Sequence, residues 1–260
     1  MELSCVLYET GDGVATVTLN RPERRNAMST QLLGELLTAL GAAKDDPEVR
    51  VVILTGAGDK AFCAGADLGG IATGAGPIQL HEERREFVKV FQLATRLGKP
   101  LIGCINGHAL AGGFGLALSC DLLVAADTAT FGTPEINVGL WPMMIMAIIG
   151  RNLPRKRAME LYMTGERIDA QTALSWGLVN RVVPLAEVRR TARDLALRLT
   201  EKSPLLMRLG RDAFFAIDDL DFESALTVLH SQLTVLTLSD DAAEGTRAFM
   251  EKRAPKFTGR

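Results

Sequence analysis

The chain has 260 residues, 47% of them hydrophobic and 23% charged, a composition typical of a soluble globular protein with a sizeable core. A net charge of −2 argues against a nucleic-acid-binding protein or one that binds anionic membranes. The N-terminal residues lack the basic start and apolar run of a signal peptide, and the longest apolar segment is too short to span a bilayer. We therefore expect a cytoplasmic protein with no nucleic-acid partner and no membrane span.

The first part of the sequence predicts a strand hairpin, then a helix and a buried strand. Strands are expected at residues 3–8 and 13–19, because the intervening ETGDG is a turn signal. Leucines spaced for one helix face follow Ser29, a good N-cap, and predict a helix over residues 30–45. The run VRVVILTGAG is typical of a strand buried on both faces.

The middle of the chain alternates between loops, strands and helices. AFCAGADLGG predicts an irregular loop, and a charged amphipathic pattern predicts a helix over residues 77–97. PLIGCING and CDLLVAAD predict two strands, separated by the loop and helix of ALAGGFGLALSCD. Strands that alternate with helices predict an α/β fold with parallel strand pairing.

The last part is predicted to be mainly helical. ATFGTPEINVGLWP is strand-like and then a loop, and GLVNRVVP predicts a further strand. Helices are expected at residues 143–151, 156–163 and 170–176, and from residue 185 to the end with an interruption near residues 203–204. The strand-free tail needs a partner for its apolar face, which is either the core or another subunit.

Several common catalytic motifs are absent from the sequence. It contains no G-x-S-x-G nucleophile elbow and no P-loop, and GAGDKA has Ala61 where the dinucleotide-binding pattern needs its third glycine. The four cysteines and three histidines match no zinc-binding spacing, so we expect free thiols and no metal. His108 lies in a glycine-rich segment, either as a pocket residue or as a structural one.

Two loops of small residues stand out as a candidate site. AFCAGADL and ALAGGFG each follow an apolar strand, and residues without bulky side chains let backbone N–H groups approach a ligand closely. Two such N–H groups aimed at one point form an oxyanion hole. The alternative is that Gly112 and Gly113 only permit tight helix packing.

Four motifs occur in order along the chain: LNRPERRNAMS, AFCAGADL, INGHALAGGFGLALSCD and FGTPEINVGL. Their order and spacing resemble the enoyl-CoA hydratase/isomerase (crotonase) superfamily. The resemblance implies an α/β, crotonase-like spiral of ββα units over residues 1–195 and a helical trimerisation region over residues 196–260. It also implies a homotrimer or a dimer of trimers, and an acyl-CoA substrate whose thioester carbonyl develops enolate character. Coenzyme A would be part of that substrate, and no tightly bound cofactor is expected.

The resemblance assigns roles to residues of these motifs. The N–H groups of Ala66 and Gly112 would be the oxyanion donors, and Glu135 would be the catalytic carboxylate. Residues of the first two motifs, and two near the C-terminus that often reach a neighbouring subunit, would bind the CoA moiety: Arg24, Arg25, Ala27, Ala64, Gly65, Ala66, Asp67, Leu68, Phe249 and Lys252. The alternative for the three cationic residues of this set is a solvated surface position.

One position departs from the family's pair of catalytic glutamates. The first glutamate is replaced by Gly115, whereas the second is retained as Glu135. One carboxylate suffices to move a proton between two carbons, so the sequence favours double-bond isomerisation of an enoyl-CoA. Hydration of a 2-enoyl-CoA, a non-catalytic acyl-CoA-binding role and other enolate chemistry are the alternatives. Met143 stands where dienoyl-CoA isomerases have an aspartate, which argues against that activity.

Overall fold

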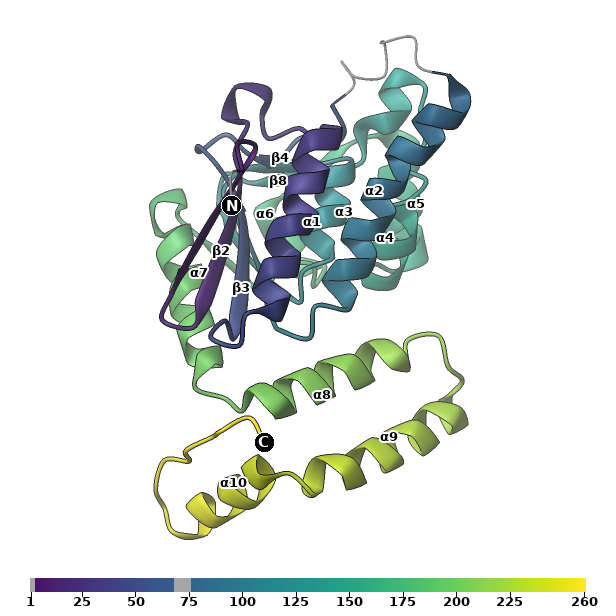
Figure 1. The fold of residues 1–260 in the computed structure, drawn as a ribbon. Helices are drawn as coiled ribbons and strands as arrows, with labels where there is room; N and C mark the ends of the chain where they lie inside the picture. Colours follow the sequence, from purple (N-terminus) through teal and green to yellow (C-terminus); the bar gives the residue numbers. More distant parts are fainter. Residues whose placement is uncertain (1–2, 68–75) are drawn as a thin grey trace.

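Two β-sheets form the centre of the structure, a computed structural model that describes residues 3–67 and 76–260 (Figure 1). The large sheet contains six strands in the order β1 (Val6–Gly11), β2 (Val14–Leu19), β3 (Val51–Gly56), β5 (Leu101–Ile105), β7 (Leu122–Ala126) and β10 (Arg181–Val183). The small sheet contains four strands in the order β4 (Ala61–Cys63), β6 (His108–Leu110), β8 (Thr130–Gly132) and β9 (Arg167–Asp169).

The large sheet confirms the predicted mixture of one hairpin and parallel pairing. Strands β1 and β2 pair antiparallel through a turn at Asp12 and Gly13, which both have positive φ. The pairings β2–β3, β3–β5, β5–β7 and β7–β10 are all parallel. Every residue of β3 is buried, as its unbroken apolar run predicts, because helices cover both faces of the sheet.

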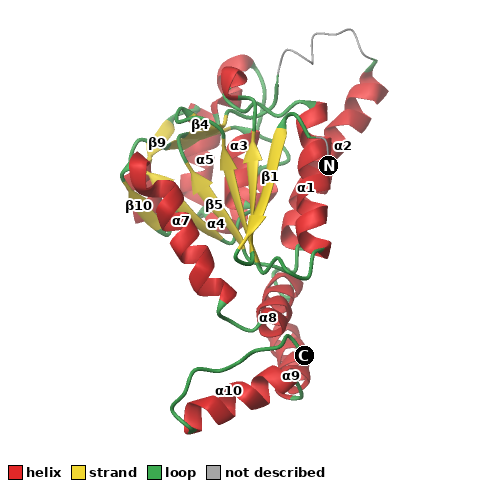
Figure 2. Ribbon diagram, turned by 60° about the vertical axis from the view of Figure 1, so that its left-hand side comes forward, coloured by secondary structure: helices red, strands yellow, loops and turns green. Residues whose placement is uncertain are grey.

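Helices on opposite faces of the large sheet provide this cover. Helix α1 (Thr30–Asp45) begins at Ser29, whose Oγ accepts a hydrogen bond from the N–H of Leu32, and it turns a leucine-rich face toward the sheet. Helix α7 (Leu185–Thr200) packs on β3, β5 and β7 from the other side (Figures 1 and 2). Helix α2 (Pro77–Thr95) packs against α1 and forms an outer layer.

The small sheet corrects the sequence-based description of this region. AFCAGADLGG and the first residues of ALAGGFGLALSCD were expected as loops, but they contain β4 and the end of β6. Each strand of this sheet has only three residues, too few to show an alternating pattern. Their pairing partners are distant in sequence, so only the folded chain brings them together.

The remaining helices connect these strands and form the C-terminal part of the chain. They are η1 (Pro22–Arg24), α3 (Gly112–Leu118), η3 (Pro134–Val138), α4 (Met146–Asn152), α5 (Arg155–Thr164), α6 (Ala170–Ser175), α8 (Pro204–Ala216), α9 (Phe222–Thr237) and α10 (Asp240–Met250). Among the residues that the structure describes, no helix is both long and apolar enough to cross a membrane.

Helices α8 to α10 lie apart from the two sheets (Figures 1 and 2). Arg211 of α8 joins them to the body, since its Nε donates to Asp121 at 2.8 Å and its Nη1 donates to the Thr95 carbonyl at 2.9 Å. Helix α9 buries none of its residues, and its exposed side chains include the large apolar Leu226 and Leu233. The predicted division between residues 195 and 196 stays a prediction, and both residues lie within α7.

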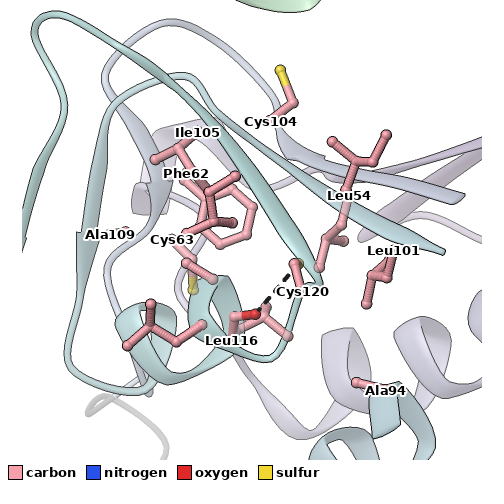
Figure 3. Packing of buried hydrophobic residues seen from close by; sticks show 14 of the residues in the cluster. Leu54, Phe62, Cys63, Ala94, Leu101, Cys104, Ile105, Ala109, Leu116 and Cys120 are labelled. Carbon is pink, nitrogen blue, oxygen red and sulfur yellow. Dashed lines mark hydrogen bonds between the residues drawn. The ribbon is translucent and has the colours of Figure 1, made fainter. Parts of the chain in front are cut away.

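The buried core extends beneath the small sheet. Figure 3 shows Phe62 and Cys63 of β4, Ala109 of β6 and Leu116 of α3 within one apolar cluster. The four cysteines are free thiols, and burial raises the pKa of Cys63 to about 12. The loops that follow β4 and β6 therefore start from strands whose side chains are tightly packed in the core.

Candidate active site

Three strands of the small sheet end at the same place. β4 pairs parallel with β6, and β6 pairs parallel with β8, so their carboxyl ends lie at one edge. The segment after β4 contains residues 64–67, the segment after β6 contains Ala111 and Gly112, and β8 leads directly into Thr133 and Glu135. The sheet thus assembles the three predicted catalytic positions from segments far apart in sequence.

The segment around Ala66 is held against the loop that follows η1. Met28 N–H donates to the Gly65 carbonyl at 2.8 Å, and Asp67 N–H donates to the Met28 carbonyl at 3.0 Å. Ala64 N–H donates to the Arg25 carbonyl at 3.0 Å. The amide N–H of Ala66 itself takes part in no hydrogen bond among the described residues, and Ala66 is exposed. The backbone on both sides of this N–H is therefore held in place, and the N–H has no partner among the described residues.

Gly112 supplies a second N–H group of this kind. It is the first residue of α3, and the N–H groups in the first turn of a helix have no partner within the helix. The preceding residue, Ala111, has a φ of 52° and no side-chain cap. Gly112 is half-buried, and no residue within 3–67 or 76–260 accepts a hydrogen bond from its N–H.

Glycines allow the two loops to touch. A Cβ atom on Gly65 would lie 2.7 Å from the Cβ of Ala111 and 3.3 Å from the backbone nitrogen of Gly112. Gly65 also has a φ of 98°, a conformation that side chains disfavour. The structure therefore brings the loops that contain Ala66 and Gly112 into contact, and the convergence of their two N–H groups on one oxygen atom stays a prediction.

Glu135 is a half-buried residue, and one oxygen of its carboxyl group lacks a hydrogen-bond partner among the described residues. Its Oε2 is buried and accepts no hydrogen bond from any residue within 3–67 or 76–260. Desolvation by burial raises the pKa of this carboxyl above its ordinary value near 4.5. A buried polar atom without a partner costs free energy, so such atoms are concentrated at functional sites.

The position of the missing carboxylate, Gly115, is closed by an apolar side chain. A Cβ atom on Gly115 would lie 2.8 Å from the Cβ of Ile145 and 3.5 Å from Cζ of Phe91. Ile145 is 4% exposed and precedes α4. A larger side chain at residue 115 has no space unless Ile145 moves. Packing therefore requires the glycine, in addition to the absence of the carboxylate that the family has at this position.

The CoA-binding residues predicted from the first two motifs lie next to each other. Arg24 and Arg25 are exposed at the end of η1, and Ala27 is half-buried beside the segment that contains Ala64 and Asp67. Leu68 lies outside the described residues. The shared position of these residues is compatible with one binding path, and their contacts with CoA stay predictions.

The two predicted residues near the C-terminus are not brought to this site within one chain. Phe249, which is 85% exposed, and Lys252 lie at the end of α10, at the opposite end of the structure from β4 (Figure 1). A role of these residues at the site requires another subunit.

Arg21 and Asn26 are the residues of the site that the sequence-based prediction missed. Arg21 contacts Asp67, and Asn26 is fully buried, yet the prediction from LNRPERRNAMS selected Arg24, Arg25 and Ala27 instead. A polar loop sequence does not reveal which of three arginines turns inward. His108, left open above, lies at the start of β6, where its Nδ1 is 2.8 Å from Thr130 Oγ1.

A family model described as enoyl-CoA hydratase/isomerase matches residues 9–260. The chain belongs to this family. Its relatives include the carnitinyl-CoA dehydratase of Proteus mirabilis, 36% identical over 256 residues that cover 96% of this chain and 97% of the relative. The short-chain-enoyl-CoA hydratase of Clostridium acetobutylicum is 34% identical over 261 residues, with 97% of each chain covered.

Solved structures agree with the family assignment. The enoyl-CoA hydratase of Mycobacterium smegmatis superimposes with a TM-score of 0.94 at 34% identity, and 98% of this chain and 99% of that chain are covered. Human enoyl-CoA hydratase domain-containing protein 3 gives a TM-score of 0.94 at 31% identity, with coverage of 98% and 100%. The crotonase fold is therefore confirmed, and the enoyl-CoA hydratase/isomerase family implies a CoA thioester substrate.

Proposed function

We propose that the protein adds water to a 2-enoyl-CoA, or removes it from the corresponding 3-hydroxyacyl-CoA, with Glu135 as its acid–base residue. The named relatives are hydratases and dehydratases, so they favour this alternative over the isomerisation that the sequence favours. The buried Oε2 of Glu135, which has no hydrogen-bond partner among the described residues, carries the proposal, together with the Ala66 and Gly112 segments at the same edge of the small sheet.

One carboxylate can carry out both proton transfers of this reaction. Glu135 takes a proton from water as the water oxygen bonds to C3, and the electron pair of the C2–C3 double bond moves to form a thioester enolate. Ala66 and Gly112 N–H groups donate to the enolate oxygen, where charge develops. Glu135 then returns the proton to C2. Burial raises the pKa of Glu135, which makes its protonated form a more accessible intermediate.

Isomerisation of a 3-enoyl-CoA is the second candidate, favoured by the apolar contact at Gly115. Glu135 would take a proton from C2 and return it to C4, with the same enolate stabilised by the same donors. This route needs no second acid and no ordered water, and Ile145 occupies the place where a second acid would lie.

Product analysis separates the two reactions. Purified protein is incubated with 2-enoyl-CoA and, separately, with 3-enoyl-CoA of several chain lengths. We expect the 2-enoyl-CoA to gain the mass of one water. Conversion of 3-enoyl-CoA alone, seen as a new conjugated absorption without a mass change, would replace hydration by isomerisation. Binding without conversion of either substrate would contradict both proposals and leave a non-catalytic acyl-CoA-binding protein.

Restoring a carboxylate at residue 115 requires a paired change. Gly115→Glu alone is expected to lower stability by about 1–3 kcal/mol, because it overpacks the contact with Ile145. Gly115→Glu with Ile145→Gly frees the space and is expected to raise the hydration rate by up to about 10²-fold over Ile145→Gly alone. Equal hydration rates in the double variant and its Ile145→Gly control would show that the second acid does not limit the reaction.

We further propose that the protein is a homotrimer or a dimer of trimers held by its C-terminal helices. Large apolar side chains are exposed on this part of the chain, including Phe214 at 64%, Leu233 at 59% and Leu238 at 80%. Phe249 and Lys252 would then contact CoA bound to a neighbouring subunit. Sedimentation should give the mass of three or six chains, and a monomer would contradict this assembly. A cytoplasmic location stays a prediction from the sequence.

A further inference from the structure

One arginine joins the loop after η1 to the segment that carries Ala66. Arg21 Nη2 lies 2.8 Å from Asp67 Oδ2, and its Nη1 donates to the Ala27 carbonyl at 2.7 Å. The side chains of Arg21 and Asp67 are 18% and 23% exposed, so this ion pair is better shielded from water than most surface pairs. The planar guanidinium thereby holds two backbone segments at once.

A buried asparagine fixes the start of this connection. The Asn26 Oδ1 accepts a hydrogen bond from the N–H of Arg21 at 3.0 Å, and the Asn26 Nδ2 donates to the carbonyls of Ala57 and Ala61 at 3.0 and 2.8 Å. Asn26 is fully buried. The backbone of Arg21 is therefore connected through Asn26 to β4 and to the turn that precedes it. The side chain of Arg21 extends from this fixed backbone to Asp67.

Contacts hold the backbone on both sides of Ala66, and Arg21 makes one of them, at Asp67. The Gly65 carbonyl and the Asp67 N–H hold Ala66 to Met28 through the backbone, and the Arg21–Asp67 pair adds a side-chain connection at the following residue. An oxyanion donor works only if it is held where the charge develops, since it must not reorganise during the reaction. The direction of the Ala66 N–H depends on this set of contacts.

We propose that Arg21 and Asp67 form a positioning pair for the Ala66 N–H and so set the strength of the oxyanion hole without touching the thioester. This inference rests on the proposed function, because it takes the Ala66 N–H as a donor to the enolate oxygen. Arg21 is a positioning residue, and its effect appears on enolate stabilisation rather than on ground-state binding of CoA.

An equilibrium measurement tests this inference without turnover. A 3-oxoacyl-CoA forms an enolate with its own near-ultraviolet absorption, and a working oxyanion hole increases the enolate fraction at fixed pH. We expect Arg21→Ala to lower the ratio of bound enolate to bound ketone by about 10- to 10²-fold, the scale of a misplaced rather than a deleted group. Arg21→Lys and Asp67→Asn should give smaller losses, because each keeps part of the contact.

Two controls show whether a loss in enolate ratio is specific to the Arg21–Asp67 pair. Arg193 makes a matched pair of contacts elsewhere, with Asp12 at 2.6 Å and the Gly11 carbonyl at 3.2 Å, so Arg193→Ala should leave the enolate ratio unchanged. A saturated acyl-CoA, which cannot form the conjugated enolate, should bind the Arg21 variants within about twofold of wild type, far less than one misplaced donor costs.

The possible results distinguish the inference from the proposed function. An unchanged enolate ratio in Arg21→Ala, Arg21→Lys and Asp67→Asn would overturn the inference alone. So would a loss of affinity for the saturated acyl-CoA in the Arg21 variants as large as their loss in enolate ratio. A wild-type protein that fails to increase the enolate fraction would overturn the proposed function and the inference with it. If Arg21→Ala does not fold, the Arg21→Lys and Asp67→Asn results decide.

Discussion

Replacing Glu135 by glutamine is expected to lower kcat by about 10²- to 10⁴-fold, the range for loss of a positioned acid–base group. Glutamine keeps the size of the side chain but cannot take up or release the proton. KM for the CoA thioester should change little, because Glu135 is proposed to act on the proton and not on the CoA moiety. Steady-state kinetics on the substrate identified by product analysis measures both constants. A variant with more than half of the wild-type kcat would remove Glu135 from the mechanism.

The same variant is expected to be more stable than wild type at neutral pH. The pKa of Glu135 is raised in the folded state, so between about pH 4.5 and that raised pKa the folded protein binds more protons than the unfolded chain. The stability contributed by this group is present at low pH and is lost as the pH rises through the folded pKa. Glutamine carries no charge to desolvate. The melting temperature of Glu135→Gln should therefore exceed that of wild type at pH 7, and the difference should vanish below about pH 4.5. A less stable variant at pH 7 would contradict the assigned burial cost.

Replacing Gly65 by alanine is expected to have the second large effect. The Cβ atom would lie 2.7 Å from the Ala111 Cβ and 3.1 Å from the Leu110 carbonyl oxygen, so the two donor loops must separate. Loss of one oxyanion donor costs about 10²- to 10³-fold in rate, and separated loops no longer aim both donors at one atom. The rate measured under saturating substrate is the readout.

The effect of backbone strain must be separated from the effect of loop separation in the Gly65→Ala variant. Gly65 has a φ of 98°, and a side chain in the left-handed region costs about 1–2 kcal/mol wherever it occurs. Gly177 has a φ of 78° and no atom within 4 Å of an added Cβ, so Gly177→Ala is the matched control. It should lose stability and keep its rate. A Gly65→Ala variant that loses only as much rate as this control would show that the loops do not depend on the glycine.

Long buried elements of this fold are predictable from the sequence, whereas most strands of the small sheet are not. The apolar run Val51–Leu54 of β3 and the leucine face of α1 can be predicted from the sequence, because burial selects their side chains directly. Strands β4, β6 and β9 have three residues each and contain small or polar side chains. Their strand conformation comes from pairing with segments far along the chain, which no local pattern encodes.

The candidate site shows the same division. Motif order locates Ala66, Gly112 and Glu135, and the structure brings their segments to one edge of the small sheet. Sequence reasoning recognised Gly115 as a lost acid but not that Ile145 fills the space, because that contact joins two separate helical segments. Arg21 was missed because its inward direction depends on the buried side chain of Asn26.

Deuterium exchange at C2 of a saturated acyl-CoA tests the central claim most directly, since this substrate can be neither hydrated nor isomerised. The protein is incubated with the thioester in D₂O, and deuterium at C2 is followed by mass spectrometry. If Glu135 exchanges protons with a C2 carbanion whose charge the Ala66 and Gly112 N–H groups hold as an enolate, wild type will incorporate deuterium. Glu135→Gln will then do so at least about 10²-fold more slowly. Equal exchange by wild type and Glu135→Gln would contradict the account.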